Sequence, residues 1–138
     1  MIVVDTNVIA YLLLPGDQTE AARGALARDA AWVAPFLWRS ELRNVLRGYM
    51  RQGHLTLAKA REVQGAAEDL MSGREFPVES ADVLALAAAS GQSAYDCEFV
   101  SLARALDIQL VTSDQEVLAN FPANAVSLKT FGSGEPAA

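Results

Sequence analysis

Two aspartates follow short strand-like segments near opposite ends of the 138-residue chain. Asp5 follows Ile2–Val4, whose β-branched side chains favour a strand, and Asp114 follows the run Leu110–Ser113. Open parallel sheets bind their ligands at the carboxyl ends of their strands, so both acids are candidates for one site. Capping of the following helix is the alternative explanation for each. Because the two residues before Asp114 also have capping side chains, we expect Asp114 to be available for another role.

A glutamate and a third aspartate fall inside apolar helical stripes. At ~100° per residue, Glu41 lies about 40° from both Leu37 and Val45, and Asp96 lies about 40° from Val100. A buried carboxylate without a partner is very costly, so each acid needs a cation, a hydrogen-bond network or a proton. A salt bridge or a position near a helix end would explain one such acid. Two of them, together with two strand-end aspartates, predict one shared site.

The residue types in this set indicate its chemistry. Carboxylates without a set of histidine or cysteine partners favour Mg²⁺ or Mn²⁺, which are hard cations that prefer oxygen ligands. Such ions activate water and neutralise charge on phosphate during phosphodiester cleavage. While no metal is bound, repulsion and burial should raise the pKa of some acids, Glu41 among them. The sequence therefore predicts four residues as both catalytic and metal-binding: Asp5, Glu41, Asp96 and Asp114.

Other functions fit the residues less well. A phosphotransfer enzyme with Asp5 as nucleophile is disfavoured because Asp5-Thr6-Asn7 lacks a second nearby aspartate, and no lysine partner is evident. A dinucleotide-binding domain is disfavoured because no Gly-x-Gly-x-x-Gly motif follows the first strand. The main alternative is a non-catalytic module that binds protein or RNA, from which substitution of Asp5 by alanine would distinguish an enzyme.

Strands and helices alternate along the chain. Strands are expected at Ile2–Val4, Trp32–Ala34, Ile108–Val111 and Ala125–Leu128, with a weak candidate at Phe76–Val78. Helices are expected at Val8–Leu14, Thr19–Ala30, Phe36–Gln52, Leu57–Met71, Ser80–Ser90, Ser93–Leu106 and Ser113–Asn120. This alternation predicts an α/β fold, with helices on both faces of a short-stranded, largely parallel sheet. We expect one domain over residues 1–131 and a flexible tail over residues 132–138.

Composition sets the remaining limits. Hydrophobic residues make up 51% of the chain, which is enough for a substantial core, and the net charge of −6 argues against a broadly basic nucleic-acid surface. Without the four candidate acids the net charge would be −2, so an RNA substrate is not excluded if those acids bind cations. The N-terminus lacks the positive segment of a signal peptide, and no apolar run approaches the ~20 residues of a membrane span. We expect a cytoplasmic protein without membrane attachment.

The segments around the four acids resemble those of PIN-domain nucleases and, within that family, of the VapC-type toxins of bacterial toxin–antitoxin pairs. Each segment is a weak signal alone, but their order and spacing cover nearly the whole chain. The matching segments are Val4–Asn7, Ser40–Leu42 with Asn44–Leu46, Tyr95–Asp96 with Leu102–Ala103, and Leu110–Asp114.

The resemblance implies a PIN-like three-layer α/β/α sandwich and Mg²⁺- or Mn²⁺-dependent endoribonuclease activity on RNA. It also implies a homodimer and inhibition by a small antitoxin protein. All four acids of the family pattern are present. Thr6 and Ser113 match hydroxyl positions beside the acids, and Asn44 matches a polar position one turn beyond Glu41, so these three are supporting candidates. The resemblance does not indicate which RNA is cut or which residues bind it.

Other conspicuous residues have simpler explanations. Trp32 and Trp38 are expected in the core or at a dimer contact, with stacking on RNA bases as the alternative. A row of arginines could bind RNA phosphates or an acidic partner, although a solvated helix face is the commoner explanation: Arg39, Arg43, Arg47 and Arg51.

Three polar or reactive residues are left outside the site. His54 follows the helix-breaking Gly53 and is expected in a surface loop. Cys97 is expected to be a small packed residue rather than a nucleophile. Glu98 is set aside because an ideal helix turns it away from the apolar stripe that contains Asp96.

Overall fold

Five short strands form one parallel sheet at the centre of the structure, a computed structural model that describes residues 1–134. Their order is β3–β2–β1–β4–β5, and every neighbouring pair is parallel. Val3 pairs with Val33 on one side and with Leu110 on the other, so β1 is the central strand. The strands are β1 (Ile2–Val4), β2 (Trp32–Pro35), β3 (Glu75–Phe76), β4 (Leu110–Thr112) and β5 (Ala125–Ser127).

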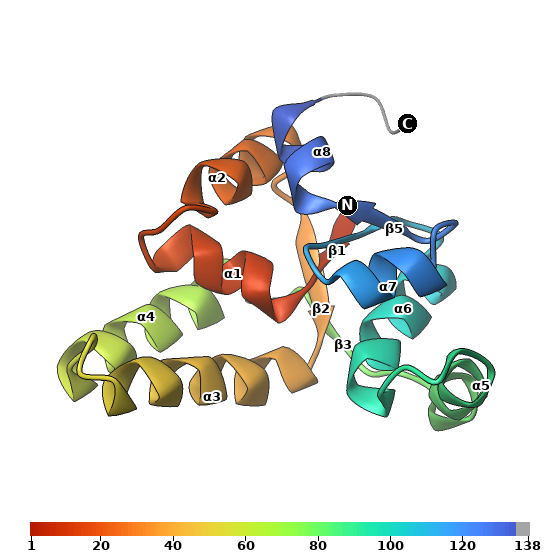
Figure 1. Cartoon of the computed structure of the whole chain (residues 1–138), viewed down its shortest axis with the longest axis horizontal. Helices are drawn as coiled ribbons and strands as arrows, with labels where there is room; N and C mark the ends of the chain where they lie inside the picture. The colour runs from red at the N-terminus through yellow and green to blue at the C-terminus, as the bar shows by residue number, and fades with distance from the viewer. Residues whose placement is uncertain (135–138) are drawn as a thin grey trace.

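Eight helices lie in the described part of the chain. They are α1 (Thr6–Leu13), α2 (Thr19–Arg28), α3 (Leu37–Arg51), α4 (Leu57–Leu70), α5 (Ser80–Ser90), α6 (Ala94–Leu106), α7 (Gln115–Asn120) and α8 (Leu128–Ser133). In Figure 1 the sheet runs between two groups of helices, α1–α4 on the left and α5–α7 on the right, which confirms the predicted α/β/α sandwich. None of these helices combines the length and apolar character that crossing a membrane requires.

The strands owe their burial to uninterrupted apolar sequence. All residues of β1, β2 and β4 are buried. A parallel sheet covered on both faces needs such continuous apolar runs, because every side chain along a strand meets one helical layer or the other.

The strand order creates a crevice at one edge of the sheet. From β1 the chain passes outward to β2 and β3, and it then returns to β4 on the other side of β1. Ligands of open α/β sheets bind outside the carboxyl ends of the strands at such a reversal. Asp5 follows β1 and Asp114 lies two residues beyond β4, so both flank the reversal.

Helix ends position the third acid at the same edge. Gly91 ends α5 with φ +73°, a left-handed conformation that glycine adopts without a steric penalty. Ser93 then caps α6, with its Oγ accepting a hydrogen bond from the Asp96 backbone nitrogen at 3.1 Å. This tight connection places Asp96 in the first turn of α6.

Several predicted strand boundaries were wrong, and those of β3 and β4 differ most. β3 contains only Glu75 and Phe76, because Pro77 has no amide proton to continue the pairing. β4 begins at Leu110 rather than Ile108, because the backbone nitrogen of Ile108 still bonds to Ala103 at the end of α6.

Helix α8 was not predicted, and it extends the folded region past residue 131. Leu128 begins this helix instead of ending β5, with Ser127 as its cap. Gly132, which we expected in a flexible tail, packs closely on α2, and a Cβ atom there would collide with the carbonyl group of Ala21. A Cβ atom on Gly24 would meet Gly132 in the same way. Residues 135–138 of the expected tail lie outside the described part of the chain.

Candidate active site

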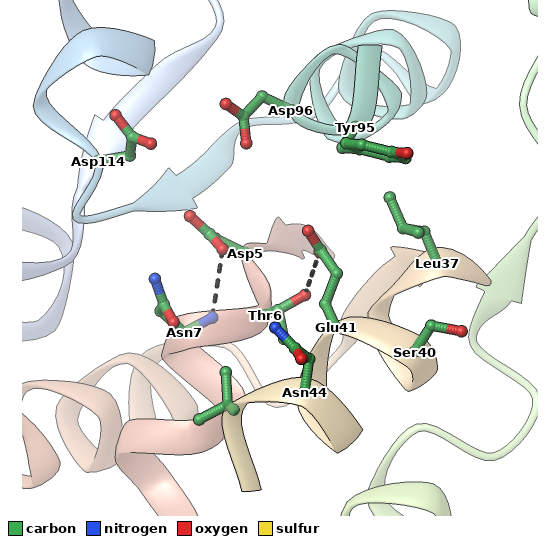
Figure 2. Close-up of a pocket in the computed structure, with 11 residues that line it drawn as sticks. Asp5, Thr6, Asn7, Leu37, Ser40, Glu41, Asn44, Tyr95, Asp96 and Asp114 are labelled. Atoms are coloured by element: carbon green, nitrogen blue, oxygen red, sulfur yellow. Dashed lines mark hydrogen bonds between the residues drawn. The ribbon is translucent and has the colours of Figure 1, made fainter. Parts of the chain in front are cut away.

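The four predicted acids line one pocket of about 390 Å³ at the carboxyl edge of the sheet. Asp5 and Asp114 come from the ends of β1 and β4, Glu41 from α3, and Asp96 from α6 (Figure 2). We call these four residues and the space between them the acid pocket. Its other lining residues are Thr6, Asn7, Leu37, Ser40, Asn44, Val45 and Tyr95.

Asp5 both caps a helix and faces the acid pocket. Its Oδ1 accepts a hydrogen bond from the Asn7 backbone nitrogen at 3.2 Å, and its Oδ2 accepts one from Thr112 Oγ1 at 2.7 Å. Burial raises the pKa of Asp5, and the charges of Asp96 and Asp114 add to the rise, while the two hydrogen bonds oppose it. Asp5 therefore caps α1 and lines the acid pocket at the same time.

Glu41 has the environment that its place in an apolar stripe predicted. Its Oε1 accepts a hydrogen bond from Thr6 Oγ1 at 2.7 Å. Burial raises the pKa of Glu41, and the negative charges of Asp5, Asp96 and Glu98 raise it further against the effect of the Thr6 hydroxyl. The expected pKa shift is confirmed, with burial as its largest cause.

Asp96 is oriented by an amide chain that the sequence did not indicate. Gln92 Nε2 donates to Asp96 Oδ2 at 2.9 Å, and Asn120 Nδ2 of α7 donates to Gln92 Oε1 at 2.8 Å. Gln92 is a buried side chain. A glutamine between two helices carries no recognisable motif, so only its spatial position reveals its role.

Asp114 caps the following helix, which is the alternative role that its sequence position allowed. Its Oδ1 accepts hydrogen bonds from the backbone nitrogens of Glu116 and Val117, at 2.9 and 3.2 Å, and so caps α7. The hydroxyl of Thr112 is unavailable for that role because it donates to Asp5 and accepts from the Asp114 backbone nitrogen at 3.0 Å. Asp114 nevertheless lines the acid pocket while it caps the helix.

The three supporting candidates differ in their placement. Thr6 bonds directly to Glu41, and Asn44 lines the acid pocket as an exposed residue. Ser113 is not among the lining residues, and its Oγ lies 3.4 Å from the Tyr11 hydroxyl. The residue that joins the two strand-end aspartates is its neighbour Thr112, which is completely buried between them.

Glu98 is closer to the site than an ideal helix suggested. It does not line the acid pocket, but its charge contributes to the raised pKa of Glu41. Burial also raises the pKa of Glu98 itself. Glu98 on α6 therefore acts on Glu41 of α3 through its charge.

The arginine row divides into a structural residue and three exposed ones. Arg39 forms ion pairs with Glu75 at 2.6 Å and with Glu68 at 2.9 Å. Within residues 1–134, no ion pair involves the other members of the row, which are Arg43, Arg47 and Arg51.

Both tryptophans are completely buried, so neither stacks on RNA bases or contacts a partner subunit. Trp38 Nε1 donates to Glu75 Oε2 at 2.9 Å. Cys97 is buried and His54 is exposed between α3 and α4, as predicted.

Within residues 1–134, no protein cation balances the charge of the acid pocket. In the described residues, none of its four acids forms an ion pair with lysine, arginine or histidine. Over the same range, no three Asp, Glu, His or Cys side chains are close enough together to hold one ion. Direct metal binding by all four acids therefore stays a prediction. The oxygen donors still fit a hydrated Mg²⁺ ion, which needs only one or two carboxylates and takes its other ligands from water and phosphate.

Comparisons with known proteins agree with the fold and with the motifs. Residues 2–123 match the PIN domain family, so the chain belongs to that family. Ribonuclease VapC3 of Pyrobaculum aerophilum is 31% identical over 135 residues, which cover 88% of this chain and 95% of that protein. The crystal structure of PAE2754 from Pyrobaculum aerophilum matches with a TM-score of 0.75 and 21% identity, over 96% of this chain and 94% of that one.

Proposed function

We propose that this protein is a metal-dependent endoribonuclease that hydrolyses phosphodiester bonds in RNA. The observation that carries the proposal is the acid pocket, where four carboxylates line the reversal of strand order and form no ion pair with a side chain of residues 1–134. The pKa values of Asp5 and Glu41 are raised, and such perturbed acids in a pocket are a common sign of a functional site. Membership of the PIN domain family and the ribonuclease name of the VapC3 relative support RNA as the substrate.

The acids of the acid pocket have different proposed roles. Asp5 and Asp96 are the acids we assign to hold Mg²⁺ or Mn²⁺, because their charges act on each other and neutral hydrogen bonds orient both. A bound ion would supply an activated water and neutralise charge that develops on the phosphate. Glu41, with its raised pKa, is suited to accept a proton from the attacking water. Asp114 lines the pocket and adds a negative charge that acts on Asp5.

We further propose that the protein acts in the cytoplasm as the toxin of a toxin–antitoxin pair, as a homodimer that a small antitoxin protein inhibits. The VapC name of the relative supports the antitoxin partner, and the homodimer and the cytoplasmic location rest on the resemblance to VapC-type toxins alone. The neighbouring genes provide a direct test. A short adjacent gene for a DNA-binding fold with a disordered tail is the expected finding, and the absence of such a gene would contradict the pairing.

Metal removal tests the proposed activity. Protein treated with excess EDTA should lose RNA cleavage, and added Mg²⁺ or Mn²⁺ should restore it. Undiminished cleavage by thoroughly demetallated protein would exclude the metal mechanism. RNA binding without cleavage under every metal condition would instead favour the non-catalytic PIN-like module.

A further inference from the structure

One end of the acid pocket presents an aromatic side chain to solvent. Tyr95 lines the pocket directly beside Asp96 and is 64% exposed. Figure 2 shows Tyr95 of α6 and Leu37 of α3 at the same end of the pocket, with Asn7 and Asp114 at the other. The pocket therefore has a polar end and an apolar end, with the carboxylates of Asp5, Glu41 and Asp96 between them.

Packing does not account for the position of Tyr95. Most of its surface is in water, and its hydroxyl makes no hydrogen bond within residues 1–134. The core side of α6 is supplied by other residues of that helix, including Cys97 and Val100, which are fully buried. Replacement of Tyr95 should therefore leave the fold intact.

A planar aromatic ring beside a site that cuts phosphodiesters suits one part of a nucleic acid. Nucleobases stack on exposed tyrosine rings irrespective of their sequence, because every base has a π-face. A base within a double helix has both faces covered by its neighbours, whereas an unpaired base has a face free for such stacking.

We propose that Tyr95, with Leu37 at the same end of the pocket, stacks on a nucleobase of the RNA next to the bond that is cut. This inference rests on the proposed ribonuclease function. It assigns the phosphate to the carboxylates and the base to the apolar end of the same pocket. Tyr95 is then a binding residue for the substrate, and the stacking is independent of base identity.

An abasic scan of a single-stranded RNA oligonucleotide that the wild-type protein cuts at one place tests the assignment. Removal of one base beside the cut should raise the KM of the wild-type protein by ~5- to 150-fold, the range expected for the loss of one stacked base. Tyr95→Ala should raise KM similarly on the intact RNA, and it should show no further loss on the abasic RNA. Tyr95→Phe keeps the ring and should behave like the wild type.

Tyr49 provides the matched control, since it is 41% exposed on α3 and does not line the acid pocket. Tyr49→Ala should retain the wild-type KM and the wild-type sensitivity to the missing base. If Tyr95→Ala cuts the intact RNA with an unchanged KM, or still responds to the abasic position, the stacking assignment is wrong. If the wild-type protein cuts no RNA at all, the proposed function fails, whatever Tyr95 does.

A second comparison separates stacking from a protein-binding role of the same surface. The wild-type protein should cut the single-stranded oligonucleotide in preference to its duplex, and Tyr95→Ala should lose most of that preference. The contrary result is that Tyr95→Ala keeps the preference for single-stranded RNA and self-associates more weakly in sedimentation. That result would assign the exposed ring to a contact between copies of the chain and overturn the proposal.

Discussion

Helix α3 contributes to two groups of acids. The pKa values of Glu41 in one group and Glu75 in the other are shifted in opposite directions, because an arginine pairs with Glu75 and not with Glu41. On one side, Glu41 belongs to the acid pocket, where its pKa is raised and its described hydrogen-bond donor is the neutral Thr6. On the other side lies the Arg39 cluster, which consists of Arg39, Trp38, Glu68 and Glu75.

The Arg39 cluster neutralises its acids internally. Arg39 bonds to both carboxylate oxygens of Glu75, at 2.6 and 2.8 Å, and this pairing lowers the pKa of Glu75. The Glu75 side chain is only 9% exposed, yet its charge is fully partnered. Burial alone therefore does not mark an acid as functional. What distinguishes the acid pocket is that its acids are partly buried without an ion pair to any cation of residues 1–134, so an ion from solution can balance their charge.

The largest effect should come from the centre of the acid pocket. Asp5→Asn and Asp96→Asn should each reduce RNA cleavage by about 100-fold or more, because a bound metal ion contributes several kcal/mol in the transition state. Both proteins should remain folded, as loss of one negative charge relieves repulsion among the acids. Single-turnover cleavage and thermal melts measure the two properties. Unfolding of both variants would show that the acids are structural.

Disruption of the Arg39 cluster should produce the opposite pattern. Glu75→Gln should lower the free energy of unfolding by about 1–3 kcal/mol, because it weakens a charged, largely buried hydrogen-bond network, and it should leave cleavage nearly unchanged.

The exposed Glu20–Arg23 pair supplies the control for Glu75→Gln, since Glu20→Gln should change stability by no more than ~0.5 kcal/mol. Urea unfolding compares the variants. Similar losses for Glu20 and Glu75, or strong loss of cleavage in Glu75→Gln, would remove the distinction between the two groups.

The two groups should also respond oppositely to pH in the metal-free protein. The raised pKa values of Asp5 and Glu41 mean that the folded state holds protons that the unfolded chain has already lost. Their contribution to stability therefore falls as pH rises from about 4 through their folded pKa values. Glu75 has a lowered pKa, so its contribution is present above about pH 4.5 and is lost as pH falls through its folded pKa.

Urea unfolding at a series of pH values in EDTA can separate these contributions. Glu41→Gln should reduce the loss of stability at rising pH, and Glu75→Gln should reduce the loss at falling pH. The same pH profile in the wild type and in Glu41→Gln would show that Glu41 does not titrate as assigned.

Local sequence patterns predicted the placement of the acids but not their hydrogen-bond partners. The apolar stripe around Glu41 located that acid correctly because helical periodicity is a local property of α3. The links from Thr112 to Asp5 and from Asn120 to Gln92 cross 107 and 28 residues of sequence, and no local pattern encodes them.

Small residues near the C-terminus led to the second error, the prediction that the tail begins at residue 132. Gly132 and Ser133 have the composition of a tail, yet they belong to α8. Contact with Gly24 stabilises this helix, and it overrides the weak helix propensity of the segment.

The affinity of the acid pocket for a divalent ion is the most direct test of the account. Thermal melts of the wild type, Glu41→Gln and the control Glu75→Gln, each with EDTA and with Mg²⁺, measure it through ligand-linked stabilisation. We expect Mg²⁺ to raise the Tm of the wild type and of Glu75→Gln by similar amounts. Glu41→Gln should begin with a higher metal-free Tm and gain less, with a difference of about 2–4 °C for each kcal/mol of lost linkage. Equal gains in the wild type and Glu41→Gln would show that the charge of Glu41 does not act on the bound ion, and no gain in any of the three proteins would contradict a metal site in the acid pocket.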